Sequence, residues 1–103
     1  MQRLYKDYIK RIEAILNQFP LESVHHLSLS LQQAWRSENK IFLCGNGGSA
    51  GNAIHLANDF IYGVDKIKGM GLQVEALPAN SSILTCLAND EGYKTIFSHQ
   101  LEG

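Results

Sequence analysis

Residues 40–59 of the chain read KIFLCGNGGSAGNAIHLAND and combine a short apolar run, a glycine-rich turn and a helix with one polar side. The apolar run at residues 41–44 has the length of a β-strand buried on both faces, and it stops at Gly45. The stretch therefore predicts a strand that leads through glycines into a helix. That order is typical of an α/β fold.

The glycine-rich turn is the first candidate site. Because glycine has no Cβ, the backbone amides around Gly47 and Gly48 can approach a ligand closely. The free N–H groups and the dipole at the N-terminus of the following helix favour an anion. Asn46 and Ser49 add a side-chain amide and a hydroxyl, which suit a polar phosphorylated metabolite better than a bare ion. The turn therefore predicts a phosphate-binding site.

The same turn fits the dinucleotide-binding pattern G-x-G-x-x-G/A over residues 45–50. That pattern expects an acidic residue about twenty positions later, at the end of the second strand. Asp65 lies instead in a segment of glycines and lysines, and Glu75 lies later, inside a strand. The lysine and hydroxyl of a nucleoside-triphosphate loop are also absent. A nucleotide site is therefore the less favoured interpretation.

Composition and charge exclude several classes of protein. The chain has 103 residues, 45% hydrophobic and 18% charged, which is typical of one soluble domain. Its net charge is −1 and it has no lysine or arginine run, so we expect no nucleic-acid or membrane partner. No apolar stretch could span a bilayer, and charges throughout residues 1–13 argue against a signal peptide. We therefore expect a cytoplasmic protein with two reduced cysteines, Cys44 and Cys86, in its core.

The N-terminal part of the sequence predicts two helices. Apolar residues at helical spacing predict an amphipathic helix over residues 4–19, ended by Pro20, and a second helix over residues 24–35. His25 and His26 are adjacent, so they diverge by about 100° around the helix and cannot easily share one metal ion. We interpret both as solvated surface residues.

The C-terminal part predicts the rest of a strand–helix–strand unit. Residues 63–71 are rich in glycine and lysine and predict a flexible surface connection, and residues 72–77 predict a second strand. Ser81 or Ser82 is expected to cap a short helix, and a last helical segment carries residues 93–101.

The predicted architecture is a helical pair at residues 1–38, followed by the start of a parallel α/β core at residues 39–103. Two parallel strands make a poor sheet, because parallel sheets need cover on both faces. We expect either further strands beyond Gly103 or an oligomer that supplies the missing surface, and we favour a truncated chain.

His55 and Asp59 form a second candidate site on the polar side of the helix after the turn. The two residues are four positions apart, so their side chains lie one above the other, within reach of the mouth of the phosphate pocket. One interpretation is a solvated helix face with a weak polar pair. The alternative is a pair of metal ligands, or a carboxylate base for proton transfer next to a carbonyl.

Two motifs carry a resemblance to a known family. CGNGGS at residues 44–49 is followed by A-x-H-x-x-x-[acid] at residues 53–59, and LTCLANDEGYKTIF follows at residues 84–97. With these motifs the chain resembles the sugar isomerase (SIS) family. Within that family it is similar to enzymes of lipopolysaccharide biosynthesis that interconvert sedoheptulose 7-phosphate and D-glycero-D-manno-heptose 7-phosphate. The resemblance implies a flavodoxin-like three-layer α/β/α fold with a parallel sheet after two N-terminal helices. It also implies a cytoplasmic homotetramer and a metal-assisted proton transfer that uses zinc.

The resemblance also implies roles for particular residues. The residues expected to bind the sugar phosphate are Asn46, Gly47, Gly48, Ser49, Asp59, Asn89 and Asp90. His55 and Asp59 would be zinc ligands, and Asp59 would also be the catalytic base, at a position where the family has glutamate. The remaining metal ligands, the general acid and a serine-rich phosphate loop are expected beyond Gly103, so residues 1–103 alone are expected to be inactive.

A different class of function remains open. Some SIS relatives are non-catalytic binding modules, such as a factor that associates with the bacterial replication initiator. The carboxylate of Asp59 favours the enzyme, because we expect a neutral residue there in an adaptor. A sugar-sensing transcription regulator is disfavoured, because the sequence has no helix-turn-helix motif or basic patch.

Overall fold

The computed structural model describes all 103 residues, which form six α-helices, two β-strands and short helical turns of other types. The chain divides into two compact units, Met1–Gln32 and Gln33–Gly103. Both candidate sites lie in the second unit.

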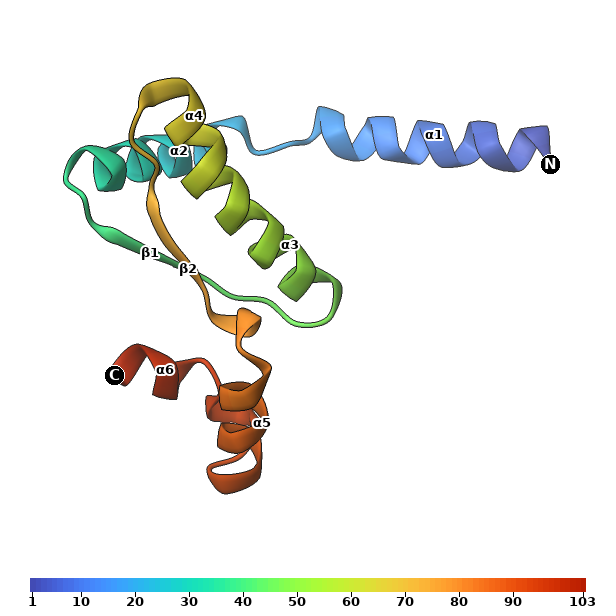
Figure 1. Cartoon of the computed structure of the whole chain (residues 1–103). Helices are drawn as coiled ribbons and strands as arrows, with labels where there is room; N and C mark the ends of the chain where they lie inside the picture. Colours follow the sequence, from blue (N-terminus) through green and yellow to red (C-terminus); the bar gives the residue numbers. More distant parts are fainter. The chain divides into compact units, whose positions relative to one another are not determined.

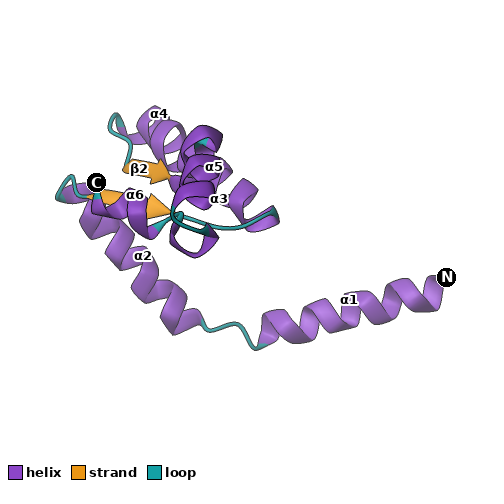
Figure 2. Ribbon diagram, turned by 90° about the horizontal axis from the view of Figure 1, so that it is seen from below, coloured by secondary structure: helices purple, strands orange, loops and turns teal.

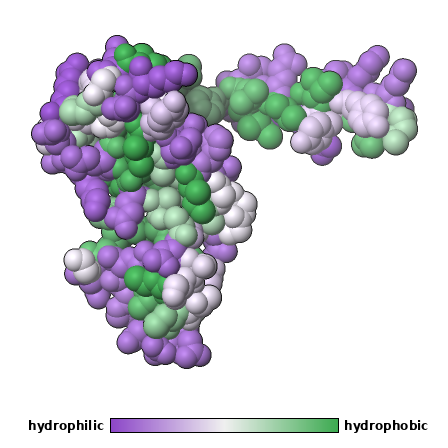
Figure 3. All heavy atoms as spheres, viewed as in Figure 1, coloured by the Kyte–Doolittle hydropathy of each residue, from purple (hydrophilic) through white to green (hydrophobic).

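The first unit contains helix α1 (Gln2–Asn17) and most of helix α2 (Leu21–Arg36), which confirms the two predicted N-terminal helices. Pro20 lies between them, where its missing N–H cannot continue the first helix. No residue of α1 is buried, and Figure 3 shows hydrophobic side chains along this helix. The exposed apolar residues of residues 4–19, here called the α1 apolar stripe, are Leu4, Tyr5, Tyr8, Ile9, Ile12, Ile15, Leu16 and Phe19. A stripe of this size is typical of an interaction surface.

The second unit is built on strands β1 (Lys40–Leu43) and β2 (Gln73–Ala76), which pair in parallel with Lys40 opposite Gln73 and Leu43 opposite Ala76. Helix α3 (Gly48–Asn58) connects the strands and contacts both of them (Figures 1 and 2). The predicted strand–helix–strand unit is therefore confirmed. Its small core consists of Ala53, Ala57, Leu72, Val74, Leu77 and Ile96.

The predicted burial of β1 and of both cysteines is wrong for this chain. Phe42 in β1 is 44% exposed, and Cys44 and Cys86 are exposed free thiols. The apolar composition of these segments is that of buried elements, but two strands with one packed helix cannot enclose both faces of the sheet. The apolar sequence of β1 is therefore that of a strand with both faces covered, and residues 1–103 do not cover both faces of this sheet.

The flexible connection predicted over residues 63–71 is also wrong, because the helix continues into it. A π-helical turn at Asp59–Gly63 follows α3, and helix α4 (Val64–Lys68) follows the turn. The lysines in the last turn of α4 interact favourably with the helix dipole. Gly69, with φ of 79°, then ends the helix in the left-handed conformation that glycine adopts readily. The prediction from glycine and lysine content therefore ended the helical segment too early.

The segment after β2 places α5 at the end of the sheet. A 3₁₀ turn at Leu77–Ala79 leads into helix α5 (Ser81–Asp90), and the side chain of Asn80 caps the helix by accepting from the Ile83 N–H at 3.2 Å. The cap is therefore Asn80 rather than Ser81 or Ser82. Asparagine caps as well as serine, so the sequence alone did not distinguish them.

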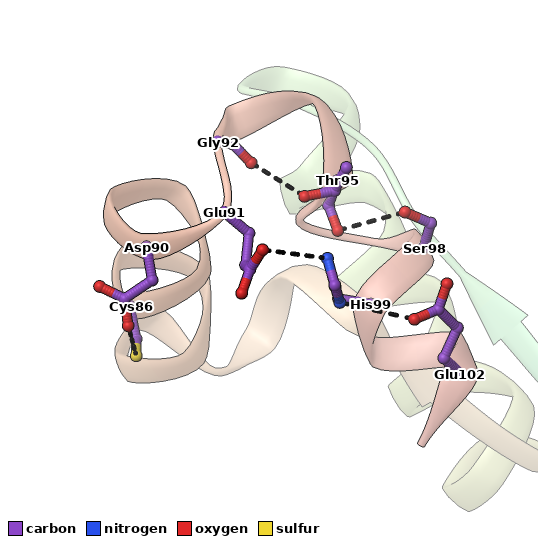
Figure 4. Close-up of polar contacts among 8 residues, drawn as sticks. All are labelled: Cys86, Asp90, Glu91, Gly92, Thr95, Ser98, His99 and Glu102. Atoms are coloured by element: carbon purple, nitrogen blue, oxygen red, sulfur yellow. Dashed lines mark hydrogen bonds and ion pairs between the residues drawn. The ribbon is translucent and has the colours of Figure 1, made fainter.

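The last segment folds back onto the end of β2. After Gly92 come a 3₁₀ turn at Tyr93–Thr95 and helix α6 (Ser98–Glu102). The Thr95 hydroxyl donates to the Gly92 carbonyl, and the Ser98 hydroxyl donates to the Thr95 carbonyl (Figure 4). Gln100 donates from Nε2 to the carbonyl of Leu77 at 3.1 Å. None of the helices has the length and apolar character needed to cross a membrane.

Candidate functional site

The turn between β1 and α3 needs glycine at two positions for different reasons. A Cβ at Gly45 would collide with the backbone carbonyl of Ser49 and lie 2.8 Å from the Ala50 nitrogen. Gly47 has φ of 60° and ψ of −119°, which is strained for any residue with a Cβ. Gly48 has no positive φ, and a Cβ there would meet open space. Gly45 and Gly47 therefore shape the turn, whereas no steric contact within the chain requires glycine at position 48.

Hydrogen bonds between Ser49 and the backbone of Asn46 hold the turn in shape. Ser49 Oγ accepts from the Asn46 N–H at 2.7 Å and donates to the Asn46 carbonyl at 3.0 Å. The Ser49 N–H also donates to the Asn46 carbonyl, at 3.2 Å. None of these hydrogen bonds uses the N–H of Gly47 or Gly48. Two backbone donors at the N-terminus of α3 are therefore free to bind an anion.

The turn lines a cavity of about 240 Å³. Gly45, Asn46 and Gly47 form one wall, and Thr85 of α5 and Tyr93 contribute to the other walls. Asn46 Nδ2 donates a hydrogen bond to the Tyr93 hydroxyl across this space. A larger open cavity of about 670 Å³ lies between α3, β2 and α5, but it contains none of the predicted site residues. The smaller cavity is therefore the better candidate for a ligand site.

His55 and Asp59 lie next to each other, as the helical spacing predicted. His55 Nε2 is 3.3 Å from Asp59 Oδ2, and the side chains are 76% and 54% exposed. An exposed pair of this kind stabilises a helix by only a few tenths of a kcal/mol. Neither residue lines the cavity at the glycine turn, so the predicted overlap with the pocket mouth is not observed in this chain.

Asn89 and Asp90 are the last two residues of α5, and both are exposed. Asn89 Nδ2 donates to Asp90 Oδ1 at 3.1 Å. The Cys86 thiol donates to Asp90 Oδ2 at 3.5 Å (Figure 4). The hydrogen bond to Asp90 and the negative charge of its carboxylate raise the pKa of the Cys86 thiol. Neither Asn89 nor Asp90 lines the cavity, although Thr85 and Ala88 of the same helix do.

Two residues of the turn site were not predicted as site residues. Gly45 was interpreted as the end of the strand and the first glycine of a dinucleotide pattern, and its close approach to Ser49 depends on the folded turn. Tyr93 was placed in the last helical segment, whereas its hydroxyl bonds to a side chain 47 residues earlier. No local spacing pattern links residues so far apart.

Comparison with known proteins places the chain in a family. The SIS domain family matches residues 5–103, and the chain belongs to this family. It is 47% identical over 68 residues to the phosphoheptose isomerase of Akkermansia muciniphila, covering 66% of this chain and 35% of that protein. It is 37% identical over 98 residues to the phosphoheptose isomerase of Helicobacter pylori strain P12, covering 95% of this chain and 48% of the relative. The chain thus spans half or less of these curated relatives.

A solved structure confirms the fold class. The phosphoheptose isomerase GmhA from Neisseria gonorrhoeae superposes with a TM-score of 0.76 at 33% identity, over 98% of this chain and 52% of that protein. The predicted α/β SIS fold, with two N-terminal helices before a parallel sheet, is therefore correct for the part of the fold that this chain contains.

Proposed function

We propose that the protein is a phosphosugar isomerase that interconverts sedoheptulose 7-phosphate and D-glycero-D-manno-heptose 7-phosphate in lipopolysaccharide biosynthesis. The main support is its likeness over nearly the whole chain to a phosphoheptose isomerase of known structure. We also propose a cytoplasmic homotetramer, for which the exposed α1 apolar stripe gives a physical reason. The same stripe leaves this chain with an unsatisfied hydrophobic surface when it is alone.

The glycine turn supplies the proposed phosphate site. The free N–H groups of Gly47 and Gly48 would donate to phosphate oxygens, and the dipole of α3 would favour the negative charge. Asn46 would bind a sugar hydroxyl, while Ser49 would hold the turn in its binding shape through the bonds to Asn46. Asn89 and Asp90 at the end of α5 would close another side of the bound sugar.

Asp59 is the proposed base. In an aldose–ketose isomerisation, a base removes the proton from the carbon next to the carbonyl and returns a proton to the neighbouring carbon. A second proton moves between the two oxygens, so no net bond to an outside group is made. The Asp59 carboxylate is exposed and can accept such a proton if the sugar carbon comes within hydrogen-bond reach.

His55 and Asp59 would also contribute to a zinc site. The separation of 3.3 Å between Nε2 and Oδ2 equals an edge of a zinc tetrahedron, which is about 3.3 Å for metal–ligand bonds of about 2.0 Å. Imidazole nitrogen and carboxylate oxygen are both common zinc ligands. The chain contains no group of three or more such residues, so further ligands would have to come from outside residues 1–103. When bound, zinc would supply a Lewis acid that polarises the sugar carbonyl.

A non-catalytic binding module of the same fold is the alternative. One experiment decides between the two functions. The full-length protein is incubated with sedoheptulose 7-phosphate in deuterated water, and the product and its deuterium content are read by NMR. Heptose 7-phosphate that carries solvent deuterium, together with stoichiometric bound zinc, supports the isomerase. Absence of both product and zinc contradicts it and supports the binding module.

A further inference from the structure

A single hydrogen bond joins the glycine turn to the segment after α5. Asn46 Nδ2 donates to the hydroxyl of Tyr93, the first residue of the 3₁₀ turn that follows Gly92. It is the only hydrogen bond in the chain between two uncharged side chains, since the other side-chain pairs involve the carboxylate of Asp90. The bond therefore connects two walls of the cavity rather than two neighbours on one helix.

The bond engages one of the two polar atoms of the Asn46 amide and leaves the other for a ligand. A tyrosine hydroxyl can accept from an amide nitrogen or donate to an amide oxygen, so either orientation of the amide leaves one atom free. Here the backbone N–H and carbonyl of Asn46 are both engaged with Ser49, and its side-chain nitrogen is engaged with Tyr93. The side-chain carbonyl Oδ1 makes no hydrogen bond within the chain. Asn46 thus keeps one free acceptor, at the wall of the cavity.

Tyr93 also lies between the two segments proposed to bind the substrate, the glycine turn and the end of α5. It follows Gly92, whose φ of 103° turns the chain at the end of α5, just after Asn89 and Asp90. The side chain of Tyr93 lines the cavity together with Gly45 and Asn46. A phenylalanine would fill the same space but would leave the Asn46 amide without its partner.

We propose that Tyr93 is a positioning residue of the sugar-phosphate site, whose hydroxyl holds the Asn46 side chain at the wall of the cavity, where its free Oδ1 accepts a hydrogen bond from a hydroxyl of the bound sugar. This inference rests on the proposed isomerase function of the same site. Tyr93 acts through Asn46 and not by its own contact with the sugar. The hydroxyl of Tyr93 and the amide of Asn46 should therefore behave as one unit in binding.

The test is a double-mutant cycle in the full-length protein. The wild type, Tyr93→Phe, Asn46→Ala and the double variant are compared by KM and kcat for sedoheptulose 7-phosphate and by its Kd from calorimetry. Tyr62→Phe, at an exposed residue that does not line the cavity, is the matched control for loss of a tyrosine hydroxyl. We expect Tyr93→Phe to raise KM and Kd about 3- to 10-fold, the effect of one neutral hydrogen bond, with kcat nearly unchanged.

The cycle separates a positioning role from a structural one. In the Asn46→Ala background, Tyr93→Phe should have no further effect on Kd, because its partner is already absent. Additive effects on Kd would overturn the proposal, since Tyr93 would then act independently of Asn46. A Tyr93→Phe protein that melts at a lower temperature but keeps its KM and Kd would also overturn it, because the bond would serve only the fold.

The cycle also distinguishes this inference from the proposed function. If the wild type binds the sugar phosphate without isomerising it, the proposed function fails, and the Kd values still decide the role of Tyr93. If the wild type neither binds nor isomerises it, both the function and the inference are wrong.

Discussion

A valine at Gly48 is the sharpest test of the phosphate-binding turn. A Cβ at Gly48 would have no neighbour within 4 Å, and Gly48 has no positive φ. Valine and glycine differ by only a few tenths of a kcal/mol in helix propensity, so Gly48→Val should change the free energy of unfolding by less than about 0.5 kcal/mol. The same change at Gly47 should destabilise the protein by about 1–3 kcal/mol, because a Cβ is strained at φ of 60° and ψ of −119°.

The effect of Gly48→Val on binding should be much larger than its effect on folding. The valine side chain would occupy the space through which an anion reaches the N–H groups of Gly47 and Gly48. A hydrogen bond to a charged group contributes about 1.5–3 kcal/mol. Loss of one such bond would raise the Kd for the sugar phosphate about 10- to 150-fold. The variant thus separates the ligand-binding role of the turn from its structural role.

The assay pairs calorimetry with urea unfolding of the full-length protein. Titration with sedoheptulose 7-phosphate and with inorganic phosphate reports binding of the whole sugar and of the anion alone. Gly51→Val is the matched control, because Gly51 lies one turn later in α3, has no positive φ and also faces open space. A folded Gly48→Val protein that binds both ligands like the wild type would refute the reasoning, since the glycines would then serve only the turn.

Three further predictions concern the other features of the chain. Asp59→Asn should lower turnover at least about 100-fold, the usual contribution of a positioned base, with little change in melting temperature, whereas Asp59→Glu should retain measurable turnover. Unchanged turnover in the asparagine variant would remove Asp59 from the mechanism. Asp90→Asn should shift the pH profile of Cys86 alkylation to lower pH, because the Asp90 carboxylate disfavours the thiolate. The profile is measured with Cys44 replaced by serine, and a profile that does not move would contradict this cause. Ile12→Glu in the α1 apolar stripe should shift the full-length protein to a smaller species in sedimentation, whereas Glu13→Gln should not; an unchanged species would separate the stripe from assembly.

The sequence predicted the features that depend on local spacing. The strand, glycine turn and helix at residues 40–59 follow from apolar periodicity, and the contact between His55 and Asp59 follows from the four-residue repeat of a helix. The parallel pairing of β1 and β2 follows from the helix that connects them. Each of these features is determined within a few residues, or by the order of neighbouring elements.

Features that depend on distant segments could not be predicted in this way. The exposure of Cys44 depends on which layers cover β1, and the apolar run alone does not contain that information. The chain after α4 returns close to the preceding helical turn, where a Cβ at Gly71 would collide with the carbonyl of Ile61. The bond between Asn46 and Tyr93 spans 47 residues. Such contacts follow from packing, which periodicity does not describe.

The two carboxylate oxygens of Asp59 explain how one short side chain could serve both of its proposed tasks. Oδ2 lies 3.3 Å from His55 Nε2, so it is the oxygen that would share a metal ion with the imidazole. Oδ1 has no hydrogen bond or ion pair within the chain and would be the one to take the proton, for which it must come within about 2.6–3.2 Å of its target. Asparagine keeps one oxygen for the metal but has no basic oxygen for the proton. Metal retention with lost turnover in Asp59→Asn would therefore separate the proton transfer of this residue from its metal binding.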